Sequence, residues 1–114
     1  MTGKPVVPRE QANRDVDAAV DYYLKEAGSR VALRFIDALE RAYRHISRYP
    51  ASGSPRYSVE LSLAGLRAWP VERFPYIVFY VEGPDHVDVW RILHATRDIP
   101  AWMRESGGEM GASR

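Results

Sequence analysis

The chain has 114 residues and no cysteine, and its 16 Lys and Arg against 15 Asp and Glu give a formal net charge of +1. This length fits one domain and is too short for two. Apolar residues make up 46% and charged residues 27%, a balance typical of folded chains and not of disordered ones. The lack of cysteine excludes thiolate catalysis and zinc–cysteine sites, and it is consistent with a reducing cytosol.

Two further classes are disfavoured by how the apolar and charged residues are distributed. Residues 1–9 hold one lysine, two prolines and no apolar run, so they do not resemble a secretory signal. The longest strongly apolar run, residues 76–81, is far shorter than the ~20 residues that cross a bilayer. No segment is a polycation, so we expect a cytoplasmic protein without direct strong nucleic-acid binding.

The first half of the chain is predicted to form a short strand and two helices. Val6 and Val7 form the strand, and Pro8 suits the first turn of a helix that ends at Gly28. Ser29 can cap a second helix, which Pro50 terminates. Apolar residues recur at helical spacing in both, at Ala12, Val16, Ala19, Val20, Tyr23, Ala27, then Ala32, Phe35, Ile36, Leu39, Ala42, Tyr43 and Ile46. The tight break between them predicts an antiparallel hairpin.

The second half is predicted to form three strands. Residues 66–71, 76–82 and 86–93 are rich in β-branched and aromatic side chains and are separated by turn residues. Short connections indicate an antiparallel meander. Pro70 has no amide hydrogen, which places its strand at an edge or marks a bulge.

The remaining segments complete a prediction of one α+β domain over residues 1–105. Asp98 can cap a short helix that runs through Trp102 and Arg104, and residues 106–114 are expected to be a flexible tail. Helices that precede the strands, instead of alternating with them, indicate a hairpin packed on one face of a small sheet. The strands are apolar on both sides, so either the C-terminal helix or a segment of a partner must cover the second face.

Two blocks of the sequence carry a family resemblance. Residues 65–80 read GLRAWPVERFPYIVFY, and residues 91–98 read RILHATRD. With the second helix, which holds Arg34-Phe35 and Leu39-Glu40 and ends at Tyr49-Pro50, they resemble the ParE branch of the RelE/ParE toxin superfamily over roughly residues 6–102. The resemblance implies a short N-terminal strand, a helical hairpin on a small curved antiparallel sheet and a short C-terminal helix.

The same resemblance implies a function. ParE-branch toxins are known for inhibiting DNA gyrase, whereas RelE-branch toxins cut messenger RNA in the ribosomal A site, and a protein antitoxin neutralises both. We therefore expect the toxin of a type II toxin–antitoxin system that arrests growth by binding gyrase and is neutralised by a cognate ParD-like antitoxin. It would need no catalytic residue, metal or cofactor. The alternatives are a ribosome-dependent mRNA endoribonuclease of RelE type, and an inactive relative retained for antitoxin binding or operon control.

The endoribonuclease alternative would need a base, an acid and cations around a phosphate. Residues of these types on or beside the predicted sheet are Arg67, Arg73, Tyr80, Arg91 and His94. Strand alternation places Asp88, Trp90, Ile92 and His94 on one face and Val87, Val89, Arg91 and Leu93 on the other, unless a bulge intervenes. That separation and the near-neutral charge both disfavour a nuclease.

Site residues are assigned by kind of partner. By the resemblance, the strand end and the C-terminal region lie near the surface associated with toxicity, so Arg91, His94 and Arg97 are assigned to target binding. Antitoxin binding is assigned to Trp69, Val71, Tyr80 and Trp90, although tryptophan serves equally in cores and interfaces.

Other kinds of site are not indicated. The three histidines show no metal-ligand spacing, and no glycine-rich phosphate loop follows a strand. The second helix carries five arginines, at positions 30, 34, 41, 44 and 48. Asp37 and Glu40 interleave with them, which predicts an ordinary solvated face.

Overall fold

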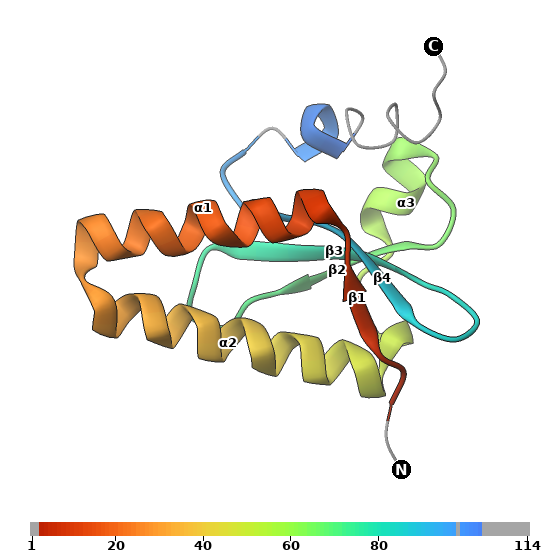
Figure 1. The fold of residues 1–114 in the computed structure, drawn as a ribbon. Coiled ribbons are helices and arrows are strands. Elements are labelled where there is room, and N and C mark those ends of the chain that lie inside the picture. Colours follow the sequence, from red (N-terminus) through yellow and green to blue (C-terminus); the bar gives the residue numbers. More distant parts are fainter. Residues whose placement is uncertain (1–2, 98, 104–114) are drawn as a thin grey trace.

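The computed structural model describes residues 3–97 and 99–103. Figure 1 shows a helical hairpin on one side of a small sheet, with shorter helices on the other. In chain order the elements are β1 (Val6–Pro8), α1 (Glu10–Ala27), α2 (Ser29–Arg48), the 3-10 turn η1 (Pro50–Ser52), α3 (Arg56–Leu61), β2 (Leu66–Pro70), β3 (Tyr76–Glu82) and β4 (Val87–His94). Residues 99–103 form a last helical segment. The predicted α+β architecture is confirmed, whereas the predicted tail, residues 106–114, lies outside the described residues.

The sheet has the strand order β1-β4-β3-β2. Strands β2, β3 and β4 form the predicted antiparallel meander. Strand β1 joins it in parallel, with Val6 opposite Val87 and Pro8 opposite Val89, so the sheet as a whole is mixed. A parallel pair needs a long connection, and here the helices and strands β2 and β3 separate β1 from β4 along the chain.

The hairpin is built around Gly28, as predicted. Its φ of 92° lies in the region that a side chain disfavours, and its amide donates to the carbonyl of Tyr23 at the end of α1 (2.9 Å). Its own carbonyl then accepts the amide of Ala32 in the first turn of α2. The two helices bury one face of the sheet, and the largest fully buried side chains there are Tyr80, Phe35, Ile46 and Ile92.

The chain itself covers the second face of the sheet. A separate core cluster joins the strands to residues 99–103 and consists of Leu66, Ala68, Phe79, Trp90, Leu93, Ile99 and Met103. Tyr57 and Leu61 of α3 pack against it. The sequence allowed either the C-terminal helix or a partner segment to cover this face. The C-terminal helical segment does cover it, together with α3, a helix that was not predicted. Helix α3 has only six residues, too few for an apolar period to be recognised.

A bulge in β4 changes which side chains share a face. Tyr80 pairs with Val89 and Phe79 with Arg91, so Trp90 is an extra residue in β4. Val89 and Ile92 consequently both pack in the hairpin-side cluster, while Trp90 packs on the opposite face. The strict alternation predicted for β4 therefore holds through Trp90 and is wrong after it, because of the bulge that the prediction had allowed for.

The outer edge of β2 is closed to another strand. Ser54 exchanges two backbone hydrogen bonds with Ala68, each 2.9 Å long, and the amide of Leu66 donates to Leu63. Pro70 contributes no amide hydrogen, and its predicted place at an edge is confirmed. Little of this edge can therefore pair with a segment of another chain.

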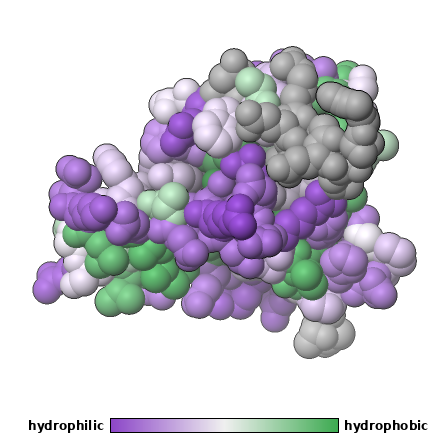
Figure 2. Space-filling model, turned by 45° about the horizontal axis from the view of Figure 1, so that its top comes forward, coloured by the Kyte–Doolittle hydropathy of each residue, from purple (hydrophilic) through white to green (hydrophobic). Residues whose placement is uncertain are grey.

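The hairpin exposes apolar surface near its tip. Figure 2 shows hydrophobic side chains grouped toward this end of the molecule, at the left of the view. Leu24 and Leu33, on either side of the Gly28 turn, are 47% and 60% exposed.

None of the helices among the described residues is both long and apolar enough to span a bilayer.

Candidate functional site at the end of β4

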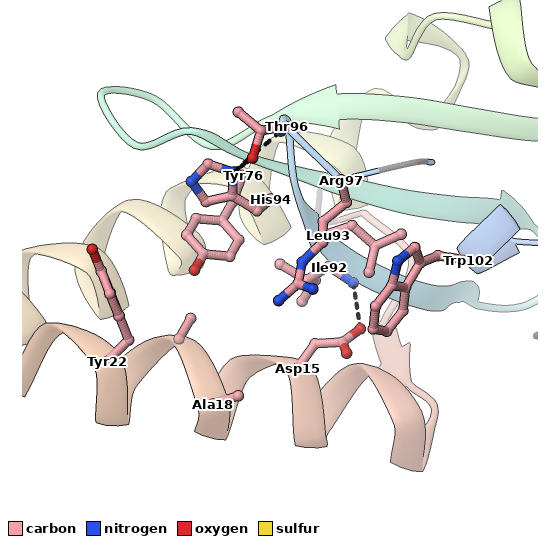
Figure 3. Close-up of a pocket in the computed structure, with 11 residues that line it drawn as sticks. Asp15, Ala18, Tyr22, Tyr76, Ile92, Leu93, His94, Thr96, Arg97 and Trp102 are labelled. Carbon is pink, nitrogen blue, oxygen red and sulfur yellow. Dashed lines mark hydrogen bonds between the residues drawn. The ribbon is translucent and has the colours of Figure 1, made fainter. Parts of the chain in front are cut away.

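A pocket of about 560 Å³ lies where β4 ends beside α1. Figure 3 shows side chains from three parts of the chain pointing into it. Its polar and aromatic lining consists of Asp15 and Tyr22 from α1, Tyr76 from β3, His94, Thr96 and Arg97 from the end of β4 and the turn after it, and Trp102. Ala18 and Ala19 form the α1 wall, and their small side chains leave the space open.

The floor of the pocket is a buried ion pair. Nε and Nη2 of Arg91 donate to the two carboxylate oxygens of Asp15, at 2.8 and 2.9 Å, and the Arg91 residue is only 2% exposed. One oxygen of the same carboxylate also accepts the amide of Ile92 (2.9 Å). Because β1 ends at Pro8, this amide lies beyond the last strand pairing, and Asp15 takes the place of a strand partner. The pair therefore fixes the end of β4 against α1.

Trp102 connects residues 99–103 to this floor. Its ring lies 5.2 Å from the guanidinium carbon of Arg91 and 4.8 Å from that of Arg97, distances at which cations are attracted to the aromatic face. Arg97 is exposed, and in Figure 3 its side chain extends into the pocket toward Asp15. One tryptophan thus contacts a buried cation on the floor and an exposed cation at the rim.

His94 is held in one orientation at the rim. Its Nδ1 accepts the backbone amide of Thr96 (3.1 Å) and lies 2.7 Å from the Thr96 hydroxyl. Its ring meets the Tyr76 ring edge to face, with centroids 5.1 Å apart. Since Nδ1 is an acceptor for the amide, the proton of the neutral imidazole resides on Nε2.

The Tyr76 hydroxyl remains protonated at neutral pH. Burial raises the pKa of Tyr76 above its ordinary value of 10.0, the positive charge of Arg97 lowers it, and Tyr22 and Asp15 raise it further. The phenol is therefore a hydrogen-bond donor that faces the pocket together with the guanidinium of Arg97. A pocket with such donors at its rim suits a carboxylate or carbonyl from a partner.

The three residues assigned to target binding come together at this pocket in different roles. Arg91 is buried beneath it, whereas His94 and Arg97 line its rim. Sequence reasoning did not identify Asp15 or Trp102 as members of the site. Asp15 carried a usable signal, because it falls between Ala12 and Ala19 on the buried stripe of α1, where an unpaired carboxylate would be costly.

Three of the four residues assigned to antitoxin binding lie in the core. Val71 and Tyr80 are buried on the hairpin side, where the Tyr80 hydroxyl donates to the carbonyl of Pro50 (2.7 Å) and accepts the amide of Gly53 (3.1 Å). Trp90 is buried on the opposite face. The side chains of these three residues are committed to the fold.

Trp69 is the half-buried exception in that group. Its ring stacks on His45, with centroids 3.9 Å apart and planes 12° from parallel. Tyr49, which is 57% exposed, lies 5.3 Å from the same histidine. An aromatic patch of these three side chains is accordingly accessible beside β2.

The residues weighed for a nuclease do not form one cluster. Arg67 donates to the carbonyl of Gly53 (2.8 Å), Arg73 lies in the turn after β2, and Arg91 is paired with Asp15. Among the described residues there is also no group of three or more side chains that could hold a metal ion.

Comparisons with known proteins agree with this fold and identify the family. A solved structure titled "Chromosomal ParDE TA system from P. aeruginosa" has a chain that matches with a TM-score of 0.68 and 19% identity, covering 80% of this chain and 95% of that one. The search of curated proteins found no match. The family described as "ParE toxin of type II toxin-antitoxin system, parDE" matches residues 6–99, and the chain belongs to this family.

Proposed function

We propose that this ParE-family protein inhibits DNA gyrase by binding it through the pocket at the end of β4, and that a cognate ParD-like antitoxin neutralises it. Membership of the toxin family supports the general role. The proposal rests on the different surroundings of two arginines at the pocket. Asp15 neutralises Arg91 on the floor, whereas Arg97 is exposed at the rim. With gyrase as its target, the protein would act in the cytoplasm.

The hydrogen bonds of the side chains at this pocket favour a role in binding a partner over a catalytic role. A general base needs a free lone pair within reach of the proton that it removes. The Nδ1 lone pair of His94 is occupied by the amide of Thr96, and the guanidinium of Arg91 is occupied by Asp15. What remains at the rim is a set of hydrogen-bond donors, which complements an acidic or carbonyl-rich patch on a protein.

A supercoiling assay with purified protein tests this proposal. The wild-type chain should inhibit gyrase, and Arg97→Glu should raise the concentration needed by about tenfold, because charge reversal at an interface rim costs attraction and speed of association. Arg14→Glu is the matched control, since Arg14 is exposed on α1, does not line the pocket and, among the described residues, pairs with Glu10 one helical turn away. It should inhibit like the wild type. Normal gyrase activity in a large excess of wild-type toxin would reject the proposal.

Further experiments, together with the supercoiling assay, test the antitoxin and the two alternative functions. Adding the protein encoded next to the toxin gene should restore supercoiling in the same reaction. Codon-linked cuts seen by primer extension on translated messages, with gyrase unaffected, would instead establish the endoribonuclease. Harmless expression of the chain without its antitoxin would indicate an inactive relative.

A further inference from the structure

A second concave surface lies on the other helix of the hairpin. It occupies about 540 Å³ between α2 and the turn that joins β2 to β3, and we call it the α2 groove. Its lining residues are Val31, Arg34, Asp37, Arg41, Glu72, Arg73 and Phe74. It shares no residue with the pocket at the end of β4.

The arginines of the α2 groove are not neutralised as Arg91 is. Within the part of the chain that the structure describes, neither the Arg34 side chain nor the Arg73 side chain makes a hydrogen bond or an ion pair. Arg41 has only a long contact with Glu72, at 4.0 Å between two well-exposed side chains. Such a contact contributes little, about 0 to 1 kcal/mol. The groove therefore presents guanidinium groups that a partner can engage.

The floor of the groove is apolar and firmly packed. Phe74 meets Phe35 edge to face at 5.4 Å and Tyr23 at 5.3 Å, so its position is fixed by the core. Val31 is half-buried beside it. Farther along α2, the aromatic patch of His45, Tyr49 and Trp69 adds accessible ring surface. A ligand for this face should combine carboxylates with an apolar side chain.

The charges of the groove distinguish a protein segment from a nucleic acid. Asp37 and Glu72 lie among its three arginines. A nucleic-acid strand carries a charge at every phosphate and would be repelled at both carboxylates, whereas a peptide can place its acidic side chains apart. Arg34 and Arg41, seven residues apart on α2, are separated by about 10 Å along the helix axis. Because Ser54 and Pro70 close the edge of β2, the segment would bind through side chains and not by adding a strand.

We propose that the α2 groove binds an acidic segment of a partner protein, with carboxylates on Arg34 and Arg73 and an apolar side chain over Val31 and Phe74. This surface goes beyond the proposed gyrase contact, because it uses different residues on a different helix. A protein bound here would leave the pocket at the end of β4 accessible. The chain would then have two separate protein-binding faces.

Selection from a phage-displayed library of random 12-residue peptides, against the immobilised full-length protein, tests this proposal without reference to gyrase. Enriched peptides should combine Asp or Glu with Leu, Ile or Phe. In fluorescence anisotropy, the double variant R34E/R73E should bind the best peptide at least about tenfold more weakly, and added salt should weaken wild-type binding. The control R30E/R44E changes two exposed arginines of α2 outside the groove and carries the same net charge, so it should bind within about twofold of the wild type.

Three results would overturn the proposal. They are enrichment of basic or uncharged peptides, no enrichment over selection on R34E/R73E, and equal loss of binding in the two double variants. Displacement of the peptide by a single-stranded oligonucleotide at lower concentration than by a second acidic peptide would mark the groove as a nucleic-acid surface instead. Circular dichroism of each variant establishes that the fold is kept. None of these results depends on whether the chain inhibits gyrase.

Discussion

The pocket at the end of β4 and the α2 groove both contain arginines, but these arginines have opposite surroundings. Arg91 is 2% exposed and spends two hydrogen bonds on Asp15, whereas Arg34 and Arg73 are exposed in the groove. A buried guanidinium needs a partner within the chain to offset its lost hydration, so it serves the fold. An exposed guanidinium has no such need and remains available to another molecule.

The same contrast exists inside the pocket on a smaller scale. Trp102 lies over Arg91 on the floor and over Arg97 at the rim. Both arginines have the residue type expected at a binding surface, yet only Arg97 is exposed. Disrupting the contacts of Arg91 should therefore lower the stability of the fold, whereas substituting Arg97 should mainly weaken inhibition.

Loss of the buried partner should have the largest effect. Asp15→Ala removes the carboxylate that accepts two hydrogen bonds from the buried Arg91 guanidinium and one from the Ile92 amide, so we expect the free energy of unfolding to fall by about 3 kcal/mol. Glu82→Ala is the comparison, because the side chains of its pair with Lys4 are 38% and 31% exposed, and its loss should cost about 1 kcal/mol or less. Urea denaturation measures both, and equal losses would contradict the distinction between buried and exposed pairs.

Removing a buried hydroxyl should have the next largest effect. Tyr80→Phe deletes one hydrogen bond to Pro50 and one from Gly53, and it leaves both backbone groups unpaired, which should cost about 2 kcal/mol. Tyr49→Phe alters a well-exposed phenol and should change stability by less than about 0.5 kcal/mol. A Tyr80→Phe variant as stable as the wild type would show that this network contributes nothing.

Arg97→Ala should separate function from stability. It removes an exposed side chain and one cation–aromatic contact, so the free energy of unfolding should fall by less than about 1 kcal/mol. At an expression level just sufficient for the wild type to arrest growth, the variant should nevertheless no longer arrest it, because weaker target binding raises the toxin concentration that is needed. Thermal denaturation beside a plating assay measures the two effects, and a stable variant that still arrests growth would remove Arg97 from the binding surface.

Substitution of Tyr43 should have the smallest effect on stability at neutral pH. Burial, and then the charge of Asp15, raise the pKa of Tyr43 from 10.0 to about 12. The folded chain therefore holds this proton more tightly than the unfolded chain. The resulting stability is fully present below pH 10 and is lost as the pH rises toward 12.

Tyr43→Phe should flatten the decline between pH 10 and 12 without abolishing it, since Tyr23, Tyr76 and Tyr80 also have raised pKa values. Its buried hydroxyl has no hydrogen-bond partner among the described residues, so the substitution should not destabilise the protein at pH 7. Urea midpoints across this pH range measure the slope. A variant with the wild-type slope would exclude Tyr43 as a contributor.

Local sequence signals predicted the hairpin and the meander, but not the features that depend on distant contacts. The apolar period and Gly28 define two helices, and turn residues define three strands. The parallel pairing of β1 depends on how the whole chain closes, and the bulge at Trp90 depends on packing against β3. Neither has a local pattern to reveal it.

The sequence directed attention to residues at and after the end of β4 but did not reveal which of them are buried. His94, at the end of β4, and Arg97, in the turn after it, line the pocket, whereas Arg91 is buried beneath it. That Arg91 lies beneath the pocket follows from Asp15, 76 residues away in sequence. The burial of Val71, Tyr80 and Trp90 likewise reflects the two-sided core, which an apolar strand pattern cannot distinguish from a partner surface.

The most direct test of the account is a titration of gyrase with the purified toxin, with residual supercoiling followed against the ratio of toxin to gyrase. An inhibitor that acts by binding should reach full effect near equimolar amounts, and excess antitoxin should reverse the inhibition completely. Lasting inactivation of many gyrase molecules by each toxin molecule, or full activity at any ratio, would contradict the claim that the exposed rim of the β4 pocket works by binding alone.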